Sequence, residues 1–194
     1  DHPGRPRIPG LPLRRRLRLR GGLIVQERFE SLVEGLFAGL QPGEVLLAGL
    51  EAEDTAFVRI NHTLLRQPGS VLQAVLELDL VVGQRHAGGR TTLSGQPAED
   101  AARATSLLGE LRSRLPHLPE DPHHLYYDGD DRSERVARDR LPEPSEALDQ
   151  VVAAAEGLDL VGIWASGPVH QGFASSLGAR RWFTAPSFNL DWSL

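Results

Sequence analysis

The chain has 194 residues, with 21 basic and 26 acidic side chains and a net charge of −5. It contains no cysteine, which excludes disulfides, thiolate metal ligands and cysteine nucleophiles. Apolar residues make up 40% of the chain and charged residues 24%, as is typical of a globular protein. No apolar run approaches the ~18 residues of a membrane-spanning helix, so we expect a cytoplasmic protein with no membrane partner.

Positive charge is concentrated in residues 1–22, which hold seven arginines, one acid and four prolines. Proline at this density prevents a helix and the like charges repel, so a disordered arm is expected there. Residues 23–194 carry the other 14 basic and 25 acidic side chains, a net charge of −11. Nucleic acid is therefore not expected as a partner of this body. A nucleic-acid-binding module that uses the arginine arm remains an alternative function.

Three helices are predicted. In the first, apolar residues recur at the spacing of one helical face: Phe29, Leu32, Val33, Leu36, Phe37 and Leu40. Pro42-Gly43 ends this helix. A second helix is expected to open at Pro97 and a third near Pro144, because proline suits the first helical turn. Gly157 is a natural C-terminal cap for the third.

Residues 44–94 change to the period of β-strands. Between Leu72 and Val82, for example, leucines alternate with Gln73, Glu77 and Asp79, as in a strand with one dry and one wet face. Turns are predicted at three places: Glu53-Asp54, Pro68-Gly69 and Gly88-Gly89. The pattern predicts an antiparallel meander.

Residues 116–141 form a long polar connection, which is unusual inside a domain and indicates a functional segment, a mobile segment or a subdomain joint. Residues 158–194 return to β character, with an expected break at Gly167-Pro168. The last apolar run, 187–194, stops in mid-strand, so we expect the protein to continue beyond it. The whole pattern predicts an α+β fold: an antiparallel β-meander packed with helices, followed by a second β-rich segment.

Four motifs partly match known catalytic or ligand-binding patterns, and for each of them a structural role is favoured. Residues 83–91 come close to a phosphate-binding loop, but Gly89 stands at the lysine position, so a hairpin turn is favoured. The adjacent His123 and His124 would diverge on a regular element and are not expected to bind a metal. The acidic run 128–131 lacks the full calcium-loop pattern, which favours a solvated turn. Ser166 does not lie on a nucleophile elbow between strand and helix.

Three stretches resist a generic interpretation: residues 57–71, residues 161–178 and residues 187–194. They resemble the N-terminal half of the TldD/PmbA family, which comprises zinc metallopeptidase-related proteins historically called modulators of DNA gyrase. The resemblance runs from about Leu23 to Leu194, and the Gly172-Phe173-Ala174-Ser175-Ser176 stretch is its most specific part. Ser175 departs from the pattern, because relatives usually carry asparagine there.

The resemblance implies an N-terminal α+β domain over 23–194, with no catalytic residue, metal ligand or cofactor of its own. Zinc belongs to a His-Glu-x-x-x-His helix in the C-terminal half of such proteins. The implied partners are that half, a related subunit in a homo- or heterodimer, and an unfolded peptide. A non-catalytic structural partner subunit is the alternative.

The resemblance also suggests which residues could line a channel for an extended peptide. A strand binds such a peptide through its backbone, and small side chains allow a close approach. The candidate substrate-binding residues are Ser166, Gly167, Gly172, Phe173, Ser175 and Ser176. The small residues among them could instead relieve crowding inside a curved sheet, and the sequence leaves both explanations open.

Overall fold

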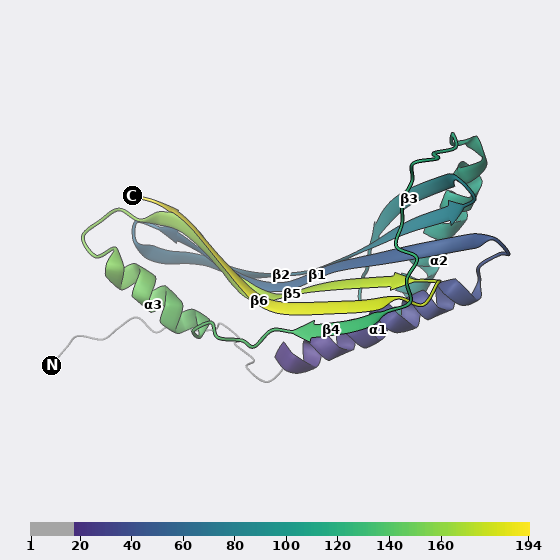
Figure 1. The fold of residues 1–194 in the computed structure, drawn as a ribbon. Coiled ribbons are helices and arrows are strands. Elements are labelled where there is room, and N and C mark those ends of the chain that lie inside the picture. The colour runs from purple at the N-terminus through teal and green to yellow at the C-terminus, as the bar shows by residue number, and fades with distance from the viewer. Residues whose placement is uncertain (1–17) are drawn as a thin grey trace.

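The computed structural model describes the backbone of residues 18–194 and the side chains from Val25 onward. In this part of the chain, helices cover one side of a long, curved sheet (Figure 1). The helices are α1 (Arg18–Ala38), α2 (Pro97–Arg114) and α3 (Pro144–Ala154), with a 3-10 turn at Leu115–His117. The strands are β1 (Glu44–Asn61), β2 (Leu64–Val82), β3 (Arg85–Thr92), β4 (Arg132–Val136), β5 (Val161–Ser175) and β6 (Arg180–Ser193).

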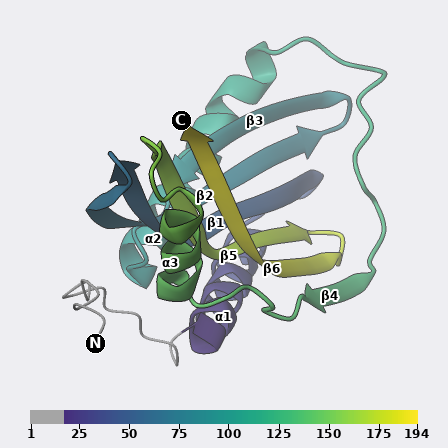
Figure 2. The same cartoon turned by 90° about the vertical axis from the view of Figure 1, so that its left-hand side faces the viewer.

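The described strands form one six-stranded sheet in the order β3-β2-β1-β5-β6-β4. The first three strands make the predicted antiparallel meander, and the β5–β6 hairpin joins it through antiparallel pairing of β5 with β1. The connection after α2 runs around the sheet to β4, which pairs parallel with β6 (Figure 2). The α+β prediction is therefore confirmed, and the second β-rich segment belongs to the same sheet.

The N-terminal arm predicted for 1–22 falls mostly outside the described residues. Residues 1–17 are not described, whereas 18–22 belong to α1. None of the helices within 18–194 is long and apolar enough to cross a membrane.

The larger hydrophobic core lies between the meander and the helices α1 and α2. Even-numbered residues of β1 and β2 point into it, because side chains alternate along a strand. The leucines of the two strands meet the apolar faces of the helices in a cluster that includes Leu46, Leu50, Leu76, Leu78, Leu80, Phe29, Val33, Leu36, Ala104, Leu108 and Leu111. This cluster fixes which face of the sheet is dry.

A smaller core lies at the other end of the same face, under α3. It contains Val58, Ile60, Leu148, Ala155, Leu160 and Trp164. Strand β1 has 18 residues and is roughly 60 Å long at about 3.3 Å per residue, so it reaches both cores. The sheet thus spans two separate hydrophobic cores.

The turns predicted at Glu53-Asp54, Pro68-Gly69 and Gly88-Gly89 are wrong, because these pairs lie inside β1, β2 and β3. The break expected at Gly167-Pro168 likewise lies inside β5. These residues weaken a strand locally, but each pair lies in a ladder with at least one neighbouring strand, which keeps the chain extended.

Several of these strand-weakening residues lie side by side between the two cores. The β1–β5 ladder runs from Leu47 to Glu53 and resumes at Ala56, and Pro168 of β5 pairs with Pro186 of β6. Prolines lack the N–H that a ladder requires. The sequence signals thus mark a weakened zone across the sheet rather than chain reversals.

The turn that joins β1 to β2 is His62-Thr63, where both residues have positive φ, 51° and 55°. Such a two-residue turn usually contains asparagine or glycine. Here the loop before β5 holds it: the Thr63 N–H donates to Leu160 O (3.0 Å) and the Leu160 N–H donates to Thr63 Oγ1 (3.1 Å). The second turn, at Gly83-Gln84, has the expected glycine, with φ of 59°. This confirms the hairpin interpretation of residues 83–91.

A partly buried ion pair ties the start of β1 to α2. Arg112 Nε and Nη2 donate to the two carboxylate oxygens of Glu44 at 2.8 and 2.7 Å, and the Glu44 side chain is only 7% exposed. Arg112 Nη2 also donates to Gly39 O at the end of the α1 segment (2.8 Å). The hydrogen bonds from Arg112 lower the pKa of the Glu44 carboxyl below its ordinary value of 4.5. The pair therefore links α1, β1 and α2.

We predict that Glu44→Gln lowers the free energy of unfolding by about 2 kcal/mol at pH 7, because it leaves the guanidinium partly buried without its anion. A lowered carboxyl pKa contributes stability above its unfolded value of 4.5 and loses it as pH falls through the folded pKa. The gap between wild type and variant should therefore close at acidic pH in urea titrations. As a control, Glu120→Gln removes an exposed pair with Arg85 and should cost less than about 0.5 kcal/mol. Equal costs for the two variants would contradict the role of burial.

Candidate functional site

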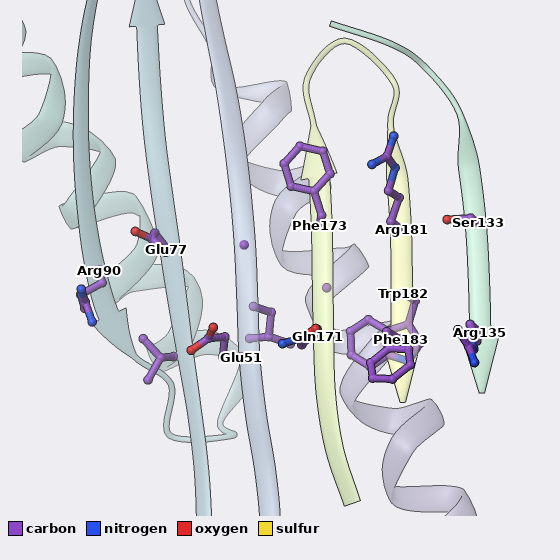
Figure 3. Close-up of a pocket in the computed structure, with 14 residues that line it drawn as sticks. Glu51, Glu77, Arg90, Ser133, Arg135, Gln171, Phe173, Arg181, Trp182 and Phe183 are labelled. Carbon is purple, nitrogen blue, oxygen red and sulfur yellow. The ribbon is translucent and has the colours of Figure 1, made fainter. Parts of the chain in front are cut away.

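The face of the sheet opposite α1 and α2 is polar and hollowed. The hollow has a volume of about 450 Å³, and its lining residues come from all six described strands (Figure 3). We call it the sheet trough. Its labelled lining side chains on this face are Glu51, Glu77, Arg90, Ser133, Arg135, Gln171, Phe173, Arg181 and Phe183. On β1, β2, β5 and β6 these trough residues are odd-numbered and the core residues even-numbered. On β3 the parity is reversed: Ala87 lies in the core and Arg90 in the trough. The alternation of side chains along a strand thus produces both surfaces.

Acidic and basic side chains of the sheet trough lie on different strands. Carboxylates of Glu51 and Glu77 lie on the central strands β1 and β2, whereas the guanidinium groups of Arg90, Arg135 and Arg181 lie on β3, β4 and β6. The phenyl rings of β5 and β6 add apolar surface between them. A surface with separated charges of both signs and aromatic rings suits an extended polypeptide, whose side chains differ along its length.

One rim of the sheet trough is built by the segment that precedes β4. Arg181 pairs with Asp131 through Nε and Nη2 at 3.1 and 3.0 Å, and its guanidinium lies 4.1 Å from the centre of the Tyr127 ring. The Tyr127 hydroxyl also donates to Asp131. The Arg181 hydrogen bonds lower the pKa of the Asp131 carboxyl, and the hydrogen bond to Asp131 raises the pKa of the Tyr127 hydroxyl. Asp131 is therefore held as an anion that fixes both neighbours.

Of the six residues predicted to bind substrate, Phe173 and Gly172 line the sheet trough. The Phe173 ring meets Tyr127 edge-on, with 6.4 Å between ring centres. Ser166 is buried in β5, where it pairs with Ala56 of β1. The structure thus separates Ser166 from the trough.

Ser175 and Ser176 hold the end of the β5–β6 hairpin. Ser175 is fully buried, and its Oγ accepts a hydrogen bond from the Leu177 N–H (3.0 Å). Ser176 Oγ accepts from the Leu46 N–H of β1 (3.0 Å), and the Ser176 N–H donates to Leu46 O (2.9 Å). Both hydroxyls are used within the chain, so their observed role is to shape the turn.

The two glycines among the predicted residues, Gly167 and Gly172, lie where neighbouring atoms leave no room for a side chain. A Cβ on Gly167 would collide with the carbonyl of Asp54 on the neighbouring strand. A Cβ on Gly172 would lie 2.8 Å from Phe29 of α1 and 2.9 Å from Trp182 of β6. Both approaches are closer than real Cβ contacts allow, so glycine lets β1 and α1 pack closely on β5.

We predict that Gly167→Ala and Gly172→Ala each lower the free energy of unfolding by about 1–3 kcal/mol, because backbone and ring atoms must move aside. The measurement is chemical denaturation at neutral pH. The matched control is Gly109→Ala in α2, where a Cβ meets nothing within 4 Å and alanine should stabilise the helix by up to about 1 kcal/mol. If the β5 variants keep wild-type stability, crowding is not the reason for these glycines.

The structure also assembles a group that the sequence did not indicate. Asp79 of β2, His86 of β3 and His124 of the segment after α2 have ligand atoms that all lie within 4.8 Å of one another. The sequence placed Asp79 on the wet face of its strand, but His124 lies 38 positions after His86 along the chain, and no local pattern indicated that the two side chains meet. His123, its neighbour, is exposed.

No protein-family model and no curated protein matches this sequence. Solved structures do match its fold. A candidate modulator of DNA gyrase from Thermotoga maritima has a TM-score of 0.57 and 14% identity, over 84% of this chain and 38% of that one. TldE from Thermococcus kodakarensis has a TM-score of 0.54 and 10% identity, over 85% and 39%. A candidate gyrase modulator from Bacteroides thetaiotaomicron has a TM-score of 0.51 and 13% identity, over 90% and 40%.

The chain shares its fold with these three structures. At these identities the likeness concerns the fold alone, and it confirms the resemblance drawn from the sequence at that level. The chain spans about two fifths of the length of these relatives.

Proposed function

We propose that this chain is the N-terminal, non-catalytic domain of a TldD/PmbA-like metallopeptidase, where it helps form a channel for an extended peptide and contributes to the dimer interface. The observation that carries the proposal is the fold shared with about 40% of the length of gyrase-modulator structures. Catalytic zinc would then be held by the other portion of the parent protein, and a cytoplasmic location belongs to the same proposal.

The sheet trough supports a role in binding peptide. Its floor consists of β-strands whose side chains offer carboxylates, guanidinium groups and phenyl rings along one open surface. Such a surface binds an extended chain through many weak contacts and demands little sequence specificity. In this arrangement, Phe173 and Gln171 on β5 lie at its centre and would contact the peptide.

The end of the sheet under α3 supports the association with another portion or subunit. Strand β3 pairs only with Val75–Val82 of β2, and β4 pairs only with 180–184 of β6. The remaining lengths of β2 and β6 are therefore edges within the described sheet. Large apolar side chains are exposed along them: Leu72 (81%), Phe188 (61%) and Trp192 (56%). Open edges with exposed apolar residues are typical of interaction surfaces.

The decisive experiment for the family assignment is to express the chain together with the remainder of its reading frame. We expect one zinc per protomer in the added portion and cleavage of an unfolded peptide by the long protein. Metal analysis and peptide hydrolysis are the measurements. An added portion without a zinc-binding helix would favour the alternative of a structural partner subunit, and an unrelated fold there would contradict the proposal.

The position of the peptide is tested with a photo-crosslinking amino acid in the same long protein. We expect a crosslinker at Gln171 in the sheet trough to capture an unfolded peptide, since Gln171 is exposed at its centre. The control position is Glu110, exposed on α2 on the other side of the sheet. Equal capture at both positions, or capture at Glu110 alone, would contradict the role of the trough. Mass spectrometry of the adducts identifies the crosslinked residue.

A further inference from the structure

We propose that Asp79, His86 and His124 form a divalent transition-metal site, with Zn²⁺ as the expected ion, that fastens the segment after α2 to the sheet. It is assembled from β2, β3 and a segment about 40 residues further along the chain. Two imidazoles and a carboxylate are a common ligand set for zinc, with a fourth position left open.

The carboxylate of Asp79 is the centre of the group. Its Oδ1 lies 3.3 Å from His86 Nδ1, and its Oδ2 lies 3.7 Å from His124 Nε2. Each oxygen thus faces one imidazole. The shorter contact is a weak hydrogen bond, and the longer one exceeds hydrogen-bond distance. The three side chains therefore converge without satisfying one another.

The second observation is the state of His124 Nε2. This nitrogen is buried and has no hydrogen-bond partner among the described residues, although the side chain as a whole is 16% exposed. Burying a polar atom without a partner is unfavourable, and such atoms are uncommon in folded proteins. A metal ion between this nitrogen and Asp79 would satisfy both groups at once.

The two imidazole rings are stacked, with 3.7 Å between ring centres and 8° between planes. An ion bound by both requires one ring to turn, so that both lone pairs point at the ion. Donor atoms up to 4.8 Å apart must also approach to about 3.3 Å for a tetrahedral Zn²⁺ with ~2.0 Å bonds.

The segment that contains His124 is already held at the correct place by other contacts. The Asp121 N–H donates to Gln84 O (2.8 Å) in the β2–β3 turn, and Arg85 Nε donates to Leu118 O (2.9 Å). These bonds position His124 over β3 before any ion binds, which lowers the cost of ordering the ligand. To bind the ion, only the loop that carries His124 must move and one imidazole ring must rotate.

Metal binding at this place would act on the sheet trough. Tyr127, three residues after His124, forms the trough rim with Asp131 and Arg181. Fixing His124 on β3 shortens the free stretch of chain that leads into the rim. The proposed ion would therefore order the rim, and its role is structural rather than catalytic.

The test is Zn²⁺ titration of the tag-free chain after chelator treatment, followed by calorimetry and by competition with a chromophoric chelator. We expect one Zn²⁺ per chain, and Co²⁺ at the same site should give the visible spectrum of a tetrahedral ion with nitrogen and oxygen ligands. His124→Ala and Asp79→Asn should each weaken binding at least tenfold. His123→Ala, which changes the exposed neighbour, and His62→Ala, which breaks the exposed pair with Asp159, should leave affinity within twofold.

Absence of saturable Zn²⁺ binding by the wild-type chain would overturn the proposal, as would equal affinity in wild type and His124→Ala. A loss in His123→Ala as large as that in His124→Ala would do the same. Circular dichroism shows whether each variant is folded, and His86→Gln serves as a second ligand variant. In addition, Zn²⁺ should slow amide exchange in residues 118–131 of the wild type but not of His124→Ala. The result does not depend on the downstream portion, so it stands or fails separately from the proposed peptidase role.

Discussion

Leucines at alternate positions of β1 and β2 pack against α1 and α2, and this contact determines both faces of the molecule. Because Leu76, Leu78 and Leu80 point into the core, Glu77 and Asp79 must point to the other side. The charged trough and the Asp79 group are therefore direct consequences of the core. A shift of one residue in strand register would exchange the two faces and destroy both.

The elements with a strong local signal were predictable from the sequence. The amphipathic pattern and the prolines at positions 97 and 144 identified the helices, and alternation identified β2. Chain reversals were not predictable, because Glu53-Asp54 and Gly167-Pro168 are local turn signals that sheet pairing overrides. The true turn at His62-Thr63 has no glycine or asparagine and is held by contacts with a loop about 100 residues away.

The candidate site was predictable only in part, because its residues are brought together by contacts between distant parts of the chain. The small residues of β5 were recognised as places of close approach, yet their neighbours could be α1, β1 or a peptide. The structure shows that Gly167 and Gly172 accommodate neighbours in this chain. The arginines of the trough come from β3, β4 and β6, and the position of β4 beside β6 rests on parallel pairing that no periodic pattern reveals. The approach of His124 to the sheet is likewise a long-range contact.

The division of the hydrophobic interior into two parts has a consequence for cooperativity. The part under α3 is small, and its stretch of sheet has neither β3 nor β4 beside it. The zone between the parts contains Pro168 and Pro186, which donate no backbone hydrogen bond. The α3 end can therefore open while the α1–α2 end stays folded, as a separate unit of lower stability. We therefore expect heat unfolding of the described part of the chain to occur in at least two steps, for which a single melting temperature would describe only the more stable end.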